Sequence, residues 1–173
     1  TPQNRTNKNI QPIKETWQTH SSKKERRTIK MKTAEKELVT IIRETVGAIP
    51  SLPFFDVVQK ILGTKYTLRL IFSTEKNIQY LNKTHRKKTY IPNTLAFPLS
   101  KNEGEIYMSL KIMRSQAKEY TLSYPDFILF LFIHSCLHLK GYAHGSTMEE
   151  QERKYLKQFA PHATYPYDYS DRN

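Results

Sequence analysis

The chain contains 173 residues, with 28 lysines and arginines against 16 aspartates and glutamates, which gives a formal charge of +12. Its length suits one globular domain. Hydrophobic residues make up 38% of the chain, whereas packed domains contain about 45 to 50%, so part of the chain is expected to be tail. The sequence has no apolar run long enough to span a membrane and no secretory-signal pattern, and its single cysteine, Cys136, cannot form an internal disulfide. These features predict a cytoplasmic protein.

Charge is concentrated at the N-terminus. Residues 1–33 carry nine lysines and arginines against two glutamates, and so +7 of the +12, with no sustained apolar period. We interpret this segment as a flexible basic arm that would add affinity for a polyanion without selectivity. The tyrosine-rich residues 161–173 are expected to be a C-terminal tail, which leaves 34–160 as a single folded domain.

Between the tails the hydrophobic period changes repeatedly, as it does when strands and helices alternate. Residues 38–46 are short and β-branched, which favours a strand over the competing helix. The pattern then predicts a helix at 53–62, a strand at 66–72 and a helix ending near residue 84.

The second half predicts two short strands, 93–97 and 105–109, joined by a loop that contains Gly104. Helices are expected at 112–122, at 124–139, and at 148–159 with Thr147 as its cap. Residues 124–139 are apolar nearly all round, which is typical of a buried central helix. The fold class predicted from these elements is α+β.

Three histidines lie near the end of this predicted central helix and just after it, in the segment HSCLHLKGYAH at residues 134–144. Residues four apart share a helix face, so His134 and His138 should project side by side. Gly141 can adopt the left-handed conformation that ends a helix, and the chain can then return with His144 as a third nitrogen ligand.

Three neutral imidazoles leave a fourth position open on a metal ion, as catalytic zinc sites do. Two histidines alone would more simply be packed and hydrogen-bonded, but the third histidine and the glycine turn favour a metal. We predict one Zn²⁺ per chain, held by His134, His138 and His144. Ni²⁺, Cu²⁺ and Co²⁺ are alternatives because imidazole suits them too. Cys136 faces away and is expected in the core.

The same spacing occurs in metzincin peptidases, H-E-x-x-H-x-x-G-x-x-H, where the glutamate after the first histidine is the general base. Here Ser135 occupies that position, and an unperturbed hydroxyl cannot hold a proton near neutral pH. This difference argues against a peptidase.

Five motifs resemble those of the YbeY family, in the same order, over most of residues 37–159. HSCLHLKGYAH resembles H-G-x-L-H-L-x-G-Y-D-H, and NTLAFP at 93–98 resembles D-V-L-S-F-P. Leu81-Asn82 followed by Arg86 resembles L-N-x-x-[YF]-R, and GEIY at 104–107 resembles G-[DE]-I-x. The fifth motif is Met148 with Glu152 in the last helix.

The resemblance implies a mixed, mainly four-stranded sheet with helices around it and the three-His site in a cleft beside the sheet. It also implies a single-strand-specific, metal-dependent endoribonuclease that acts in ribosomal RNA maturation and ribosome quality control, with ribosomal RNA and the small ribosomal subunit as partners. The candidate catalytic residues are Arg86 and His138. The candidate RNA-binding residues are Arg86, Lys87 and Lys88, and Arg86 is the natural phosphate contact because a guanidinium can bind two phosphate oxygens.

Four positions depart from the family pattern: Ser135 replaces a glycine, Ala143 and Asn93 replace aspartates, and His85 stands where an aromatic residue is usual. Loss of an acidic group beside His144 can reduce metal affinity or activity about 10 to 100-fold. Two other functions therefore stay open: a zinc hydrolase of another substrate class, or a catalytically weak ribosome- or RNA-binding protein with a structural metal.

Overall fold

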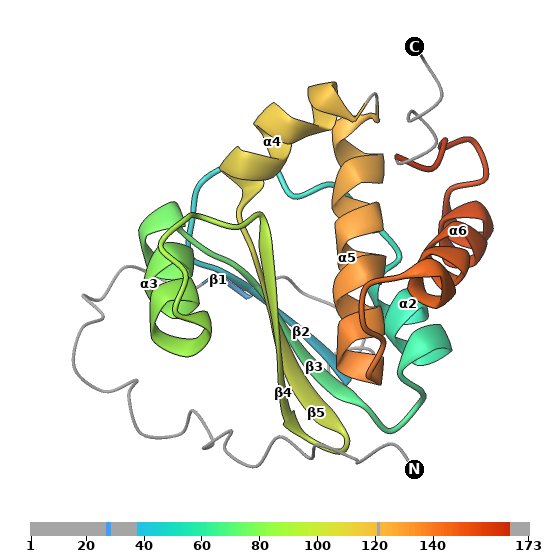
Figure 1. The fold of residues 1–173 in the computed structure, drawn as a ribbon, viewed down its shortest axis with the longest axis horizontal. Helices are drawn as coiled ribbons and strands as arrows, with labels where there is room; N and C mark the ends of the chain where they lie inside the picture. The colour runs from blue at the N-terminus through green and yellow to red at the C-terminus, as the bar shows by residue number, and fades with distance from the viewer. Residues whose placement is uncertain (1–26, 29–37, 121, 167–173) are drawn as a thin grey trace.

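The computed structural model describes residues 27–28, 38–120 and 122–166. Its sheet has the strand order β1-β2-β3-β5-β4 (Figure 1). The strands are β1 (Arg27–Thr28), β2 (Val39–Arg43), β3 (Thr67–Phe72), β4 (Thr94–Ser100) and β5 (Glu103–Met108). β2, β3 and β5 run parallel, whereas β1 and β4 pair antiparallel at the two edges. The predicted mixed sheet of four main strands is confirmed, and the strand predicted within residues 38–46 is β2, which ends at Arg43.

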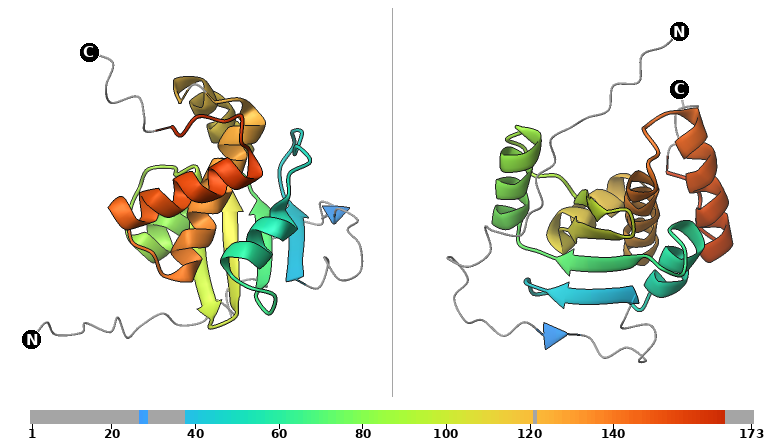
Figure 2. Two further views of the ribbon diagram at one scale, coloured as in Figure 1. Left: turned by 90° about the vertical axis from the view of Figure 1, so that its right-hand side faces the viewer. Right: turned by 90° about the horizontal axis from the view of Figure 1, so that it is seen from below.

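Helices cover both faces of the sheet (Figures 1 and 2). They are α2 (Phe54–Ile61), α3 (Glu75–Arg86), α4 (Leu110–Glu119), α5 (Tyr124–Lys140) and α6 (Ser146–Phe159). Alternation along β3 explains the two layers: Leu68, Leu70 and Phe72 join the large core with α2, α4, α5 and α6, and Ile71 joins a smaller core with α3. The strand alternation thus places α3 opposite the central helix.

The central helix α5 is buried as predicted. Its capping residue Ser123 accepts a hydrogen bond from the backbone N–H of Asp126, 3.2 Å away, and its C-cap Gly141 has φ +104°, in the left-handed region. Cys136 is completely buried in the core, which confirms its expected position, and burial raises the pKa of its thiol. The helix is therefore fixed at both ends before it contributes its histidines.

Two local predictions were wrong. Helix α6 begins at Ser146 with Gly145 as N-cap, so Thr147 lies inside the helix. Gly104 lies in β5 and not in the connecting loop. The helix predicted to end near residue 84 is confirmed as α3, which extends to Arg86 and has Lys87, with φ 58°, as its C-cap, so Arg86 belongs to the last helical turn.

Two segments assigned to tails contribute to the described fold. Arg27 and Thr28 pair with Arg43 and Ile42 of β2, and the rest of 1–33 lies outside the described residues. Tyr165 is buried in the core with 5% exposure, whereas 167–173 lie outside the described residues. The domain limits 34 and 160 therefore exclude residues that pack on the domain.

No single described helix is long and apolar enough to cross a membrane. Helices α4 and α5 meet the length and composition criteria only when taken together, as a pair bent by 108°.

Gly104 is required by packing. A Cβ atom at this position would lie 2.5 Å from the Tyr66 hydroxyl oxygen and 3.0 Å from Leu139 Cδ2. Gly104→Ala is therefore expected to lower the free energy of unfolding by about 1 to 3 kcal/mol, as overpacking does. Urea denaturation of the variant and the parent protein measures this difference.

Tyr66 provides the control for this prediction. Its hydroxyl is buried without a hydrogen-bond partner in the described part of the chain, and burial raises its pKa to about 12. Tyr66→Phe removes the closest atom, so Tyr66→Phe/Gly104→Ala should recover part of the loss. Equal stability of Gly104→Ala and the parent protein would show that the strand accommodates the methyl group.

Candidate metal centre

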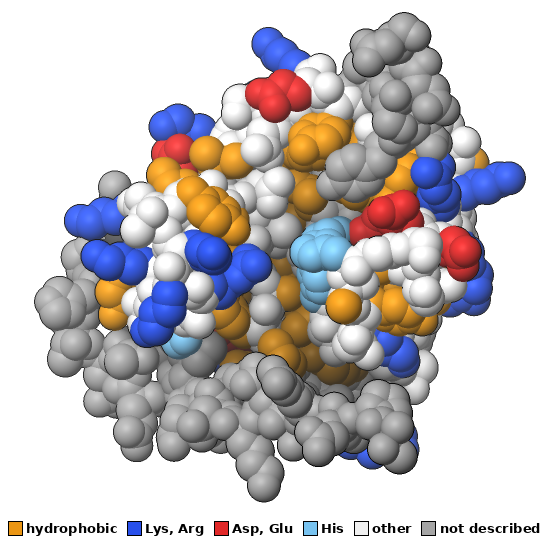
Figure 3. All heavy atoms as spheres, in the orientation of Figure 1, with side chains coloured by type: hydrophobic (Ala, Val, Ile, Leu, Met, Phe, Trp, Pro, Cys, Tyr) orange, Lys and Arg blue, Asp and Glu red, His pale blue; other side chains and the backbone are white. Residues whose placement is uncertain are grey.

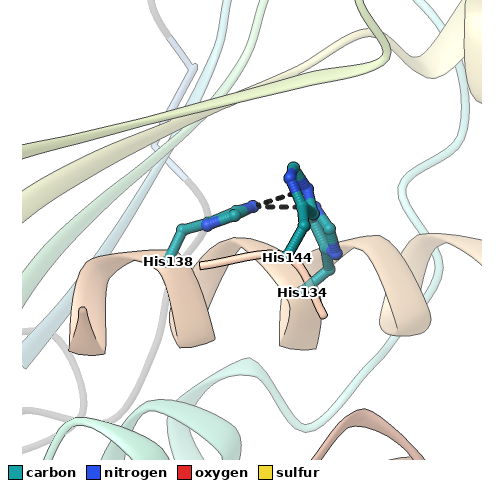
Figure 4. A group of neighbouring side chains, drawn as sticks. All are labelled: His134, His138 and His144. Atoms are coloured by element: carbon teal, nitrogen blue, oxygen red, sulfur yellow. Dashed lines mark hydrogen bonds between the residues drawn. The ribbon is translucent and has the colours of Figure 1, made fainter. Parts of the chain in front are cut away.

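The three predicted histidines converge at the C-terminal end of α5 (Figure 4). His138 Nε2 lies 3.1 Å from His134 Nε2 and 3.1 Å from His144 Nε2. One ligand atom from each residue lies within 4.8 Å of the others. The turn at Gly141 makes this possible: the N–H of Tyr142 donates to the Leu137 carbonyl, 3.0 Å away, and the chain reverses toward the helix.

The other nitrogens of two rings are engaged with acceptors. His134 Nδ1 lies 2.6 Å from Glu152 Oε1, and His138 Nδ1 lies 3.0 Å from the carbonyl oxygen of Tyr142. A carboxylate and a carbonyl can only accept, so both Nδ1 atoms carry the proton. Both Nε2 lone pairs are left free for a metal, which is the arrangement that carboxylate and carbonyl partners impose on ligating histidines.

Electrostatics favour the neutral ligand form of His138. Burial and the neighbouring His134 lower the pKa of His138 below its ordinary value. An imidazole binds a metal only when it is deprotonated, so the lowered pKa keeps His138 available as a ligand at neutral pH. Three neutral nitrogen donors with two oriented rings fit a borderline transition-metal ion such as Zn²⁺.

The buried carboxylate of Glu152 on α6 contacts the histidine cluster through His134. Glu152 is 2% exposed, and its second oxygen accepts a hydrogen bond from the Tyr165 hydroxyl, 2.5 Å away. Burial and the Glu152 carboxylate raise the pKa of Tyr165, so the phenol stays protonated and donates. The Tyr165 ring also packs edge-on against Phe130, with ring centroids 5.8 Å apart. Glu152 was predicted only as part of a family motif, and the prediction that Tyr165 lies in a loose tail was wrong.

The histidines form one wall of a cleft of about 490 Å³. Arg86, from the last turn of α3, lines the same cleft together with the segment 90–96 that leads into β4. Figure 3 shows the histidines at the edge of a hollow, with basic side chains across it on the α3 side. Lys87 and Lys88 do not line the cleft, and the Lys87 ammonium donates to the Thr84 carbonyl at 3.0 Å. The structure thus brings Arg86 to the histidines but leaves the two predicted lysines outside the cleft lining.

Three of the four departures from the family pattern have contacts in the structure. The hydroxyl oxygen of Ser135 lies 2.8 Å from that of Thr94 in β4, which links the histidine helix to the sheet. The Asn93 amide donates to Gln116 Oε1 at 2.9 Å, and His85 packs edge-on against Phe97 with centroids 5.3 Å apart. Ala143 offers no side-chain acceptor beside His144.

Comparison with known proteins places this geometry in a family. The family model described as "Endoribonuclease YbeY" matches residues 19–160. A protein of that name from Alkaliphilus metalliredigens is 37% identical over 100 residues, which span 51% of this chain and 64% of the relative. A protein with the same name from Campylobacter jejuni is 31% identical over 114 residues, which span 61% of this chain and 84% of the relative.

The fold agrees with a solved structure. The solution structure of TM1509 from Thermotoga maritima matches with a TM-score of 0.52 and 25% identity, over 70% of this chain and 89% of that protein. This chain spans somewhat less than two thirds of the Alkaliphilus relative and most of the Campylobacter and Thermotoga proteins. The resemblance predicted from the five motifs is confirmed. The chain belongs to the YbeY endoribonuclease family.

Proposed function

We propose that the protein is a metal-dependent endoribonuclease that hydrolyses phosphodiester bonds of single-stranded RNA. One observation carries the proposal: three histidines that could hold a metal ion and the arginine Arg86 line the same cleft. A bound metal and an arginine are the two groups that most often stabilise the charge that develops on a transferring phosphoryl group. Family membership and the formal charge of +12 support an RNA substrate.

The proposed cofactor is one Zn²⁺ per chain, held by His134, His138 and His144, with Ni²⁺ as an alternative. When bound, the ion would supply Lewis acidity toward a phosphoryl oxygen or a water molecule. Glu152 and the Tyr142 carbonyl orient two of the imidazole rings toward the common centre. His138, which lies between the other two nitrogens, is the histidine whose loss would most disturb the site.

Arg86 is the proposed phosphate contact. Its planar guanidinium can donate to two phosphate oxygens at once and can stabilise additional negative charge in the transition state. Among the residues that the structure describes, none that lines the cleft is an aspartate or a glutamate, so no described side chain of the lining repels a phosphate. Lys87 and Lys88 would act outside the lining, as contacts to phosphates further along the strand.

We propose ribosomal RNA within the small ribosomal subunit as the natural substrate and RNA maturation and ribosome quality control as the role. The test combines metal analysis of the purified protein with cleavage of a structured ribosomal RNA fragment by the zinc-loaded form. Metal-dependent cleavage at single-stranded positions supports the proposal. Hydrolysis of a peptide or a small ester without RNA cleavage would overturn it in favour of another zinc hydrolase.

A catalytically weak RNA-binding protein is the second candidate, because Ala143 offers no side-chain acceptor where the family pattern has an aspartate beside the last histidine. In that case, wild-type protein would bind the RNA fragment without cleaving it, and His138→Ala would bind it equally well.

The hydrogen bond between Glu152 and His134 yields a prediction on metal affinity. Glu152→Gln preserves the shape of the side chain but removes its charge, so the affinity for Zn²⁺ should fall about 10 to 100-fold. Tyr165→Phe removes only the donor to Glu152 and should lower the affinity less. Competition with a chelating dye measures both constants.

Glu150→Gln is the matched control, since Glu150 lies on the same helix but is exposed. Its zinc affinity should equal that of the wild type. If Glu152→Gln also retained the wild-type affinity, the Glu152 hydrogen bond would have no influence on the metal site.

A further inference from the structure

Two exposed apolar side chains lie in the candidate active-site cleft. Four large hydrophobic residues are exposed in the described part of the chain: Val46, Tyr80, Tyr90 and Ile91. Of these, Tyr90 and Ile91 line the cleft that also contains Arg86 and the histidines. Tyr90 is 55% exposed. An exposed aromatic side chain beside a cationic site points to a ligand with flat apolar faces and negative charge.

The backbone that carries Tyr90 is held in place. The Gln79 amide donates to the Thr89 carbonyl at 2.8 Å, and the Asn82 amide donates to the Tyr90 carbonyl at 2.9 Å. Asn82 is completely buried, so this second hydrogen bond comes from a side chain that is shielded from solvent. At the other end of the segment, the Ser109 N–H donates to the Asn93 carbonyl at 2.9 Å. Tyr90 is thus presented in the cleft at little conformational cost on binding.

The groups beside Tyr90 in the cleft indicate the chemical class of the ligand. Arg86 precedes Tyr90 by four residues and lines the same cleft, and the described residues of this lining include no carboxylate. Nucleic-acid single strands combine a phosphate backbone with unstacked bases, and proteins bind them through cationic groups together with aromatic rings on which bases stack. In a duplex the bases are stacked on one another and cannot reach such a ring.

We propose that Tyr90 is a stacking platform for one nucleobase of the single-stranded RNA substrate, next to the phosphate at Arg86, with Ile91 as its apolar edge. This inference rests on the proposed function and adds the residue that selects single strands. Because every base offers a flat face, the contact favours single strands without specifying a sequence.

The test uses the full zinc-loaded chain and a fluorescent single-stranded octamer of 2′-O-methyl RNA, checked on a gel for integrity. Fluorescence anisotropy gives the dissociation constant. Tyr90→Ala should weaken binding about ten-fold, which lies within the range for one stacked base, and Tyr90→Phe should stay within about two-fold of the wild type. Tyr80→Ala is the matched control, because Tyr80 is 60% exposed but does not line the cleft, and it should bind as the wild type does.

Two further probes separate stacking from other effects. An octamer of abasic ribose phosphates should bind Tyr90→Ala and wild type equally, and a duplex of the same sequence should bind both weakly. Unchanged affinity of Tyr90→Ala for the single strand, or an equal loss on the abasic strand, overturns the inference while leaving the proposed function standing. Absence of wild-type binding to any RNA probe overturns the proposed function itself.

Discussion

The His134→Ala/His138→Ala double variant is expected to lose its bound metal, as measured by elemental analysis after gel filtration. His138 Nε2 lies 3.1 Å from each of the other two nitrogens, so the double substitution leaves His144 alone as a ligand. In the wild type, a metal at about 1,000 times its dissociation constant should add about 4 kcal/mol to the free energy of unfolding. Chelation should therefore lower the melting temperature of the wild type and leave that of the variant unchanged.

His162→Ala is the control for this experiment. Its Nε2 lies 3.0 Å from Asp126 Oδ1, away from the histidine cluster, so the variant should keep its metal. A double variant that retained one ion per chain would move the metal to another set of ligands and would remove the basis of the proposed chemistry.

Arg86→Ala is expected to lower the rate of RNA cleavage about 10² to 10³-fold under single-turnover conditions, the usual cost of removing a group that stabilises transition-state charge. The metal content should not change, because Arg86 lies on α3 and contributes no ligand atom to the histidine cluster. Arg86→Lys should recover little of the rate, since an ammonium cannot make two parallel hydrogen bonds to one phosphate.

Lys88→Ala removes a positive charge two residues away and outside the cleft lining. It should weaken RNA binding mildly and uniformly, with little change in the cleavage rate at saturating RNA. Wild-type cleavage by Arg86→Ala, or equal losses in the two variants, would show that Arg86 contributes only general attraction.

The metal ligands could be predicted from the sequence because their arrangement is local. His134 and His138 are one helical turn apart, and Gly141 permits the left-handed conformation that returns His144, so helix geometry alone nearly determines the cluster. Strand β3 and helix α5 were likewise predictable from their hydrophobic patterns, since residues 66–72 alternate and residues 124–139 are apolar nearly all round. Strand β1 was not predictable in this way, because Arg27 and Thr28 lie in a segment without an apolar period.

The support of the site could not be predicted in this way. Helix α6 contains Glu149, Glu150 and Glu152, and only the packing of α6 on α5 decides which of them reaches His134. Tyr165 lies in a stretch whose composition resembles that of a tail, and its burial depends on contacts with residues far away in the chain, such as Phe130. Arg86 was predicted from a motif, but its place in the cleft lining depends on how α3, which ends at Arg86, and the segment that leads into β4 pack beside α5.

The contact between Tyr165 and Glu152 also affects how the protein should be shortened for expression. Similarity to the family model ends at residue 160, which would be the natural place for a stop codon. A chain cut there would lose the hydroxyl that contacts the carboxylate behind His134 and would expose the part of Phe130 that Tyr165 covers. A fragment that ends after residue 166 retains both contacts, so the useful boundary of this domain is set by the hydrogen bonds of its metal centre and not by the extent of its sequence similarity.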